Sequence, residues 1–341
     1  MRETIVVTGG AGYIGSHIGY MLAQKGYHVI LLDNLIYHQS LAPFTWATVR
    51  VNDYGDAAVL DTLFKEHQVK AVVHCAAYIE VRRSVKEPHD FYENNVVKTI
   101  TLLDRMRAHG VPYIIFSSSC AVYGKPQVVP IAEDHPQNPI SPYGNTKHMI
   151  ELILKDYNAA YGLKYVSLRY FNAAGALVEQ HLCEQHDPET HLIPLIIQSA
   201  ITGKPFTIFG TSHPTPDGTC IRDYIHVIDI ADAHIRALNH IMNGRPSDSF
   251  NLGTGVGISV REMVNAVEQL YDIKVKITHD APHQDDLPII VLDASRARDI
   301  LGWEARNTTL NLMIKSAYIS ALKHAANLSH DMCERIQKIV L

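Results

Sequence analysis

The sequence has few of the features that mark secreted or membrane proteins. It contains five cysteines, Cys75, Cys120, Cys183, Cys220 and Cys333, and none of them forms a C-x-x-C pair. This odd, scattered set favours reduced thiols over a disulfide framework. No apolar run reaches the roughly 18 residues that a membrane span needs, and no leader of signal-peptide type precedes the first predicted strand. We therefore expect a cytoplasmic protein without a membrane partner.

Charge and histidine content argue against two further classes. The formal net charge is −5 at pH 7 and no basic run is present, so we expect no nucleic-acid partner. The 20 histidines are dispersed and no H-E-x-x-H motif occurs, so we expect no metal site. With 341 residues, 47% of them hydrophobic, the chain is long enough for about two domains with a sizeable core.

What the sequence does contain is an alternation of short apolar segments and helix-length amphipathic segments through its first half. The predicted strands are Ile5–Thr8, Val29–Leu32, Val49–Val51, Ala71–His74, Tyr113–Ser117 and Tyr165–Leu168. The predicted helices are Tyr13–Lys25, Ala57–His67, Asn94–His109 and Tyr143–Tyr161. This order predicts an α/β fold: a doubly wound parallel Rossmann sheet with a smaller C-terminal substrate-binding α/β domain.

The regular alternation of strand-like and helix-like segments ends after Asn172, and this change suggests the domain boundaries. We expect the Rossmann domain to cover residues 1–173, with 224–253 returning to it. The smaller domain would comprise 174–223 and 254–325, and a helical extension would occupy 326–341. A helix at Leu192–Thr202 and a strand at Phe206–Phe209 are expected in the smaller domain.

A glycine-rich turn follows the first predicted strand. Glycines at positions 9, 12 and 15 permit a tight turn and close approach of the backbone to a pyrophosphate. A lone glycine triplet also fits an ordinary turn, but here it opens a βαβ unit and Asp33 follows the next strand. An acid at that position binds ribose hydroxyls and repels a 2′-phosphate, which favours NAD over NADP. Asp53 is a candidate for the adenine or, alternatively, for the cap of the following helix.

Tyr143 and Lys147 stand four residues apart in a predicted helix, downstream of a serine run that ends at Ser119. Residues at this spacing share one helical face. A free tyrosine has a pKa of about 10, and a neighbouring cation lowers the pKa of such a phenol. The sequence therefore predicts a base that takes a proton from an alcohol while a nicotinamide accepts hydride.

These motifs resemble those of the extended short-chain dehydrogenases/reductases and, within them, the UDP-glucose 4-epimerases. The resemblance covers the chain to about Leu310 and includes Ser117–Ser119, Ser141–Lys147, Leu168–Asn172 and Arg222–Val227. It implies NAD-dependent C4 epimerisation of a UDP-hexose through a transient 4-keto sugar. In that reaction Tyr143 would take the 4-hydroxyl proton, Ser119 would bind the same oxygen, and Lys147 would hold the nicotinamide ribose.

The resemblance also implies a set of binding residues. The implied NAD contacts are Gly9, Gly12, Tyr13, Ile14, Gly15, Asp33, Asn34, Asp53, Tyr54, Cys75, Ala76, Ala77, Ile79, Asn94, Ser119, Tyr143, Lys147 and Phe171. The implied substrate contacts are Ser119, Tyr143, Asn172, His191, Leu192, Thr207, Ile208, Phe209, Arg222, Asp286 and Ile290. Simpler alternatives exist: Phe171 and Leu192 as core residues, Asn94 as a helix cap, and Arg222 as the partner of Asp223 in a surface pair.

A homodimer is a further implication of the resemblance. In the family, the helices that correspond to Asn94–His109 and Tyr143–Tyr161 pair with their copies. Their apolar residues here include Val97, Ile100, Leu103, Met149 and Ile153. Packing of the same residues on their own sheet is the alternative.

The sequence departs from the family pattern at several substrate positions. His283 stands where an arginine commonly binds the UDP diphosphate, and Asp285 replaces a glycine. Histidine does not replace a bidentate arginine equivalently. Ile79 replaces a lysine of some epimerases, and His191 stands where several have asparagine. Ile290 replaces the tyrosine of narrow-specificity relatives, which leaves more room beside C2 and predicts tolerance of N-acetylhexosamines.

Other functions remain open at this point. A 4-epimerase of a UDP-pentose or of UDP-glucuronate would share the same catalytic residues, and a net NAD-dependent dehydrogenase would release NADH. A 4,6-dehydratase needs carboxylates where Cys120 and Ala121 stand, so it is disfavoured. A binding protein without catalysis would have no use for Ser119, Tyr143 and Lys147 together.

Overall fold

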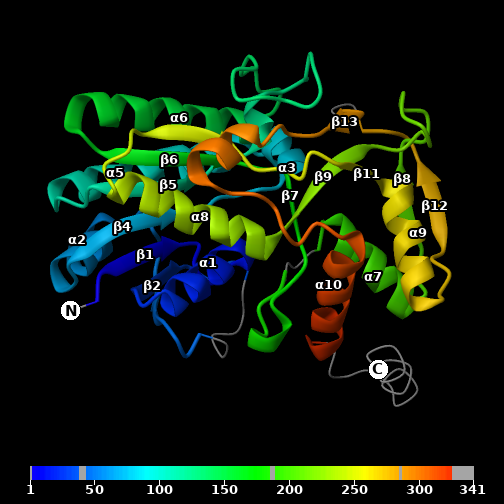
Figure 1. The fold of residues 1–341 in the computed structure, drawn as a ribbon, viewed down its shortest axis with the longest axis horizontal. Coiled ribbons are helices and arrows are strands. Elements are labelled where there is room, and N and C mark those ends of the chain that lie inside the picture. Colours follow the sequence, from blue (N-terminus) through cyan, green and yellow to red (C-terminus); the bar gives the residue numbers. More distant parts are fainter. Residues whose placement is uncertain (1, 38–43, 185–188, 284–285, 325–341) are drawn as a thin grey trace.

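The larger part of the protein is a seven-stranded sheet in which every neighbouring pair of strands is parallel (Figure 1). The computed structural model describes residues 2–37, 44–184, 189–283 and 286–324. The strand order is β3-β2-β1-β4-β5-β6-β10. The strands are β1 Thr4–Thr8, β2 His28–Asp33, β3 Thr48–Val51, β4 Val69–His74, β5 Tyr113–Ser117, β6 Lys164–Arg169 and β10 Asp248–Asn251. The six predicted strands and the doubly wound sheet are confirmed.

Helices cover both faces of this sheet. They are α1 Tyr13–Gln24, α2 Ala57–Glu66, α5 Lys98–Ala108, α6 Pro142–Tyr161 and α8 Val227–Met242. Two short helices, α3 Val81–Lys86 and α4 Pro88–Tyr92, pack against α6. Successive strand residues point to opposite faces. Ile5 and Val7 accordingly pack in a core cluster with residues of α1 and α8, whereas Val6 lies in a second cluster with residues of α2, α5 and α6. This double burial explains why the strands are nearly continuous apolar runs.

One predicted helix is interrupted. The sequence predicts a single helix over Asn94–His109, but a π-helical turn, η1, spans Glu93–Val97 before α5 begins at Lys98. Thr99 Oγ1 donates to the carbonyl oxygen of Asn95 at 2.6 Å in this region. The predicted helix is therefore confirmed, and its first turn is a π-helical turn, a feature that is frequent at functional sites.

The remaining elements form a second group beside the carboxyl end of the sheet (Figure 1). Its strands are β7 Asn172–Ala174, β8 Phe206–Phe209, β9 Ile221–His226, β11 Gly257–Ser259, β12 Ile277–Asp280 and β13 Ile289–Ile290. Its helices are α7 Leu192–Thr202, α9 Val260–Tyr271 and α10 Leu310–His324. A short helical turn, η3 Val178–Gln180, contacts α10 of this group, whereas η2 Cys120–Val122 and η4 Ala297–Leu301 pack against α6 and α8 of the large sheet. α7, α9 and α10 pack around a third core cluster.

α8 follows the second group's strand β9 but packs against α1, β5 and β6 of the large sheet. The predicted domain boundaries stay a prediction, as does the return of 224–253, although this packing agrees with that return. The predicted extension 326–341 lies outside the described residues. Within the described part, no helix has both the length and the apolar character needed to cross a membrane.

Candidate active site

A cavity of about 530 Å³ opens at the carboxyl ends of β1, β2, β4 and β5. Four segments that directly follow those strands line it: Gly9–Gly15, Asp33–Asn34, Cys75–Arg82 and Ser117–Ser119. Residues of α6 and of the second group close the other side. The carboxyl edge of an open parallel sheet is where such folds bind ligands, so this cavity is the candidate site.

The glycine-rich turn leaves backbone amides free to bind an anion. Gly12 is the N-cap residue of α1 and provides no side-chain cap, so the first amides of the helix lack that partner. A Cβ atom on Gly15 would overlap the carbonyl oxygen of Gly9, so a side chain there would push the turn apart. Asp33 supports the turn by accepting hydrogen bonds from the amides of Ala11 (3.0 Å) and Leu35 (2.8 Å). The turn therefore offers what a pyrophosphate requires.

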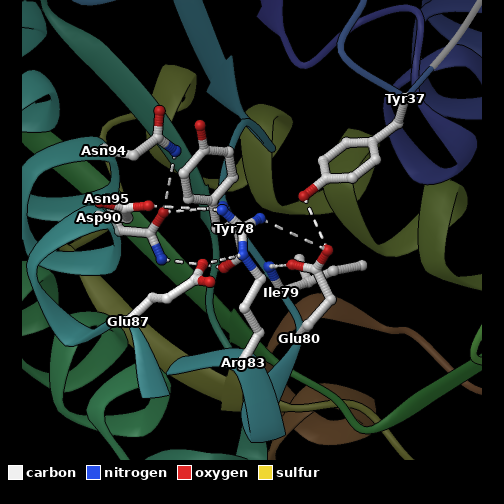
Figure 2. A network of polar contacts seen from close by, with 9 residues as sticks. All are labelled: Tyr37, Tyr78, Ile79, Glu80, Arg83, Glu87, Asp90, Asn94 and Asn95. Carbon is white, nitrogen blue, oxygen red and sulfur yellow. Dashed lines mark hydrogen bonds and ion pairs between the residues drawn. The ribbon is translucent and has the colours of Figure 1, made fainter. Parts of the chain in front are cut away.

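A second segment of the cavity wall is held by Asn95 (Figure 2). Its side-chain oxygen accepts from the amide of Tyr78 at 2.8 Å, and its side-chain nitrogen donates to the carbonyl of the same residue at 3.0 Å. That nitrogen also lies 3.2 Å from Thr146 Oγ1, the neighbour of Lys147 in α6. Asn95 thus ties the loop after β4 to the catalytic helix. Asn95 is not among the residues predicted from the sequence, although it directly follows Asn94, which is.

Helix α6 begins where it does because of three residues. Ser141 caps the helix by accepting from the amide of Gly144 at 3.1 Å, and Pro142 occupies the first turn. A Cβ atom on Gly144 would lie 2.7 Å from the carbonyl oxygen of Ala121, so only glycine lets α6 approach the turn after Ser119 this closely. The helix start therefore brings Tyr143 and Lys147 to the cavity beside Ser119.

The electrostatics of the three predicted catalytic residues differ from the expectation. Burial raises the pKa of Tyr143 to about 12, against which a hydrogen bond with Ser119 acts to lower it. Lys147 lies one helical turn further along α6. Its Nζ lies 5.9 Å from the centroid of the Tyr143 ring and donates to the carbonyl of Ser117 at 2.7 Å. Burial therefore dominates the pKa of Tyr143, and the lowering of that pKa by Lys147 stays a prediction.

Burial also acts on Lys147 itself. It lowers the pKa of the ammonium to about 8, although the neighbouring Cys75 and Glu151 act to raise it. Glu151 lies one helical turn further along α6 and accepts from Ser118 Oγ at 2.5 Å. The serine run and α6 are therefore joined both at the carbonyl of Ser117 and at the hydroxyl of Ser118.

Of the implied cofactor residues Asp53, Tyr54 and Asn94, the first lies outside the cavity lining and the other two belong to it. Asp53 does not line the cavity; its carboxylate accepts from Lys98 Nζ at 2.6 Å and from the amide of Gly55 at 2.8 Å. The alternative that Asp53 caps the next helix was wrong, since Asp56 caps α2. Tyr54 and Asn94 are buried and line the cavity, and the Tyr54 hydroxyl donates to the carbonyl of Asn94.

Asn94 lies inside the π-helical turn, so the alternative that it caps a helix was also wrong. The other implied cofactor residues line the cavity: Gly9, Gly12, Tyr13, Ile14, Gly15, Asn34, Cys75, Ala76, Ala77, Ile79 and Phe171.

The cavity gathers three of the implied substrate residues in addition to Ser119 and Tyr143, namely Asn172, His191 and Leu192. His191 is committed to two acids, because its Nδ1 lies 3.0 Å from oxygens of both Glu184 and Glu189. Burial opposes its charge, but hydrogen bonds with these two carboxylates raise the pKa of His191 to about 10. It therefore stands in the cavity as a cation rather than as a neutral substitute for asparagine.

The other implied substrate residues do not line this cavity. Thr207 and Ile208 lie on β8, where Ile208 belongs to the third core cluster. Ile290 is buried in a separate cluster that contains Cys120. Asp286 accepts from the amide of His283 at 3.1 Å.

Arg222 is not half of a surface pair. It donates to the carbonyl of Ile221 at 2.9 Å, and its guanidinium lies 5.4 Å from the centroid of the Phe171 ring. Asp223 is buried and accepts instead from Thr254, Gly255 and Leu292. The alternative of an Arg222–Asp223 surface pair was wrong.

A nicotinamide dinucleotide fits this site. The amides at the start of α1 suit its pyrophosphate, Asp33 suits an adenosine ribose, and Ser119, Tyr143 and Lys147 line the same cavity. A Rossmann sheet with this arrangement defines a class of enzymes that oxidise or reduce an alcohol with a nicotinamide.

The chain belongs to the NAD dependent epimerase/dehydratase family, whose profile matches residues 5–253. It is 45% identical to the UDP-glucose 4-epimerase of Rhizobium leguminosarum bv. trifolii over 318 residues, which cover 93% of this chain and 96% of that one. The crystal structure of UDP-glucose 4-epimerase from Brucella ovis in complex with NAD superposes with a TM-score of 0.90 at 42% identity, covering 93% of this chain and 98% of that one. The enzyme from Bifidobacterium longum, in complex with NAD⁺ and UDP, gives 0.90 at 35% identity, covering 95% and 100%.

Proposed function

We propose that the protein is an NAD-dependent 4-epimerase of UDP-hexoses that interconverts UDP-glucose and UDP-galactose. The observation that carries this proposal is that Ser119, Tyr143 and Lys147 line the same cavity as the glycine-rich turn. The named relatives, which act on UDP-glucose, support the substrate class.

The side chains have separate tasks in this reaction. Bound NAD supplies the acceptor, and later the donor, of a hydride at the sugar C4. The Tyr143 side chain, as the phenolate, takes the 4-hydroxyl proton and, as the phenol, later returns it. Ser119, which is buried and hydrogen-bonded to Tyr143, holds the same sugar oxygen. Lys147, fixed by the carbonyl of Ser117, holds a positive charge beside the phenol.

Incubation of the purified protein with four nucleotide sugars tests this proposal: UDP-glucose, UDP-N-acetylglucosamine, UDP-xylose and UDP-glucuronate. We expect UDP-galactose from UDP-glucose without net formation of NADH. Accumulation of NADH in proportion to product would instead identify a net dehydrogenase. Epimers of the pentose or uronate alone would identify the corresponding alternative 4-epimerase.

The same experiment tests the predicted tolerance of N-acetylhexosamines. Ile290 is buried against Cys120 and Leu292, and the partly buried Phe171 packs on the same cluster. The proposal is that Ile290, which is smaller than the tyrosine of narrow-specificity relatives, leaves space for Phe171 to move when the substrate carries an N-acetyl group at C2. Turnover of UDP-glucose without turnover of UDP-N-acetylglucosamine would contradict it.

We also propose that the protein forms a homodimer through η1 and α6. Of the predicted interface residues, Leu103 is fully buried in the core of its own chain and Ile153 is partly buried against it. Val97 and Met149, in contrast, are 48% and 40% exposed. Leu152 adds a third exposed apolar side chain on α6, at 48%. Apolar side chains that gather on neighbouring elements favour an interface between copies.

Replacing Leu152 with glutamate is expected to convert the dimer to a monomer, because it introduces a charge into the apolar face. Light scattering coupled to size-exclusion chromatography measures this. Leu312→Glu on α10 is the matched control, since Leu312 is 41% exposed but lies on a different element. A Leu152→Glu protein that remains dimeric at micromolar concentration would contradict the proposed interface.

A further inference from the structure

Two consecutive arginines of α3 have opposite environments. Arg83 is saturated within the protein: it donates to Glu87 at 2.6 Å and to Asp90 at 3.5 Å, and its guanidinium lies 4.9 Å from the centroid of the Tyr78 ring (Figure 2). It also lies 4.0 Å from Glu80, which accepts from the Tyr37 hydroxyl. Arg83 therefore anchors this short helix against the wall of the cavity.

Arg82 makes no hydrogen bond or ion pair with any part of the chain that the structure describes. It lines the cavity, and its guanidinium carbon lies 5.3 Å from the centroid of the Phe209 ring. An arginine over an aromatic ring uses the face of its guanidinium and leaves the N–H edges available. Those edges form a fork that matches two oxygens of a phosphate. Arg82 is thus an exposed, uncommitted cation at the cavity, available to bind an anion.

Arg82 lies between the dinucleotide end of the cavity and the second group of elements. α3 follows β4, whose loop lines the dinucleotide end, whereas Phe209 ends β8 in the second group. The Phe209 ring in turn lies 4.3 Å from the His283 ring. The guanidinium therefore reaches the region where the sequence analysis places the substrate and where His283 replaces an arginine.

We propose that Arg82 binds the diphosphate of the nucleotide-sugar substrate, as the cation that His283 does not provide. This inference rests on the proposed function, because it assumes a substrate that carries a nucleoside diphosphate. Arg82 lies on α3 and its guanidinium extends toward Phe209 at the end of β8. A diphosphate bound by Arg82 would therefore contact both groups of elements. Arg83, only one residue away, has no such role because its donors are already used.

Calorimetric titration of the NAD-loaded protein with UDP and with uridine tests the assignment. Arg82→Gln is expected to weaken UDP binding on the order of 10- to 100-fold, the usual effect of removing a charge-assisted hydrogen bond. Uridine binding should change by less than about twofold, because uridine lacks the diphosphate. Arg50→Gln is the matched control. Arg50 is an exposed arginine on β3 that pairs with Glu66 of α2, and it does not line the cavity.

A second variant separates the loss of a contact from damage to the fold. His283→Arg in the Arg82→Gln background restores a guanidinium beside Phe209, and we expect it to recover most of the UDP affinity. Equal affinities of the wild-type and Arg82→Gln proteins for UDP would overturn the assignment, as would parallel losses for UDP and uridine. A wild-type protein that binds UDP through Arg82 but epimerises no UDP-sugar would contradict the proposed function and leave this assignment standing.

Discussion

Replacement of Tyr143 by phenylalanine is expected to lower kcat for epimerisation about 10³-fold, within the range that a positioned acid–base group contributes. The variant loses the phenol hydroxyl that Ser119 contacts in the cavity. The residual rate would come from binding and orientation of the substrate, which the other residues still provide.

The fold should tolerate this change. Phenylalanine keeps the ring, so no void forms, and the lost hydrogen bond with Ser119 is a modest contribution to stability of about 1 kcal/mol. The glycine turn and Asp33 are untouched, so NAD should remain bound. The expected result is therefore an inactive protein with a normal melting temperature and normal NAD content.

Tyr157→Phe is a suitable control for this experiment. It removes a hydroxyl that donates to Asp104 on the surface of α5, far from the cavity lining. Steady-state assays of both variants with UDP-glucose should separate them by roughly three orders of magnitude in kcat. A Tyr143→Phe protein with near-normal kcat would show that another group takes the proton, and the mechanism proposed here would be wrong.

Much of the fold follows from local patterns in the sequence. Strands such as Val29–Leu32 are apolar at every position because both faces of the sheet are covered, and this is visible without coordinates. The ends of α6 are equally local. Ser141 caps its start, and Gly162 ends it with a φ of +74° that favours glycine. The positions of Tyr143 and Lys147 on one helical face could therefore be predicted.

The contacts that set the chemistry of the site were less accessible. Lys147 bonds the carbonyl of Ser117 rather than Tyr143, a choice that depends on how α6 sits against β5. Asn95 and Tyr78 are 17 residues apart, and nothing in the spacing indicates that one side chain would hold both backbone groups of the other. Arg82 and Arg83 are identical in type and adjacent in sequence, so only the folded chain shows which is committed.

The buried pair of Glu151 and Arg169 shows the same limit and leads to the second large prediction. Arg169 donates to Glu151 through Nε (2.9 Å) and Nη2 (2.5 Å), and through Nη1 to the Tyr123 hydroxyl (2.8 Å). Both charged side chains are buried, and Glu151 also accepts from Ser118 beneath the catalytic serine. The pair therefore stabilises the junction of β5, β6 and α6 on which the site is built.

Arg169→Met should reduce the free energy of unfolding at pH 7 by about 3–5 kcal/mol, because it leaves the Glu151 carboxylate buried without its partner. Urea denaturation measures this loss.

Glu151→Gln added to Arg169→Met separates the cost of the stranded charge from the loss of packing. Glutamine carries no charge and still accepts from Ser118, so the double variant should be more stable than Arg169→Met alone. We expect a recovery of at least 1–2 kcal/mol, since an unpaired buried charge is the larger part of the penalty. A double variant that is no more stable than Arg169→Met would mean that packing around Tyr123, rather than charge, makes Arg169 essential.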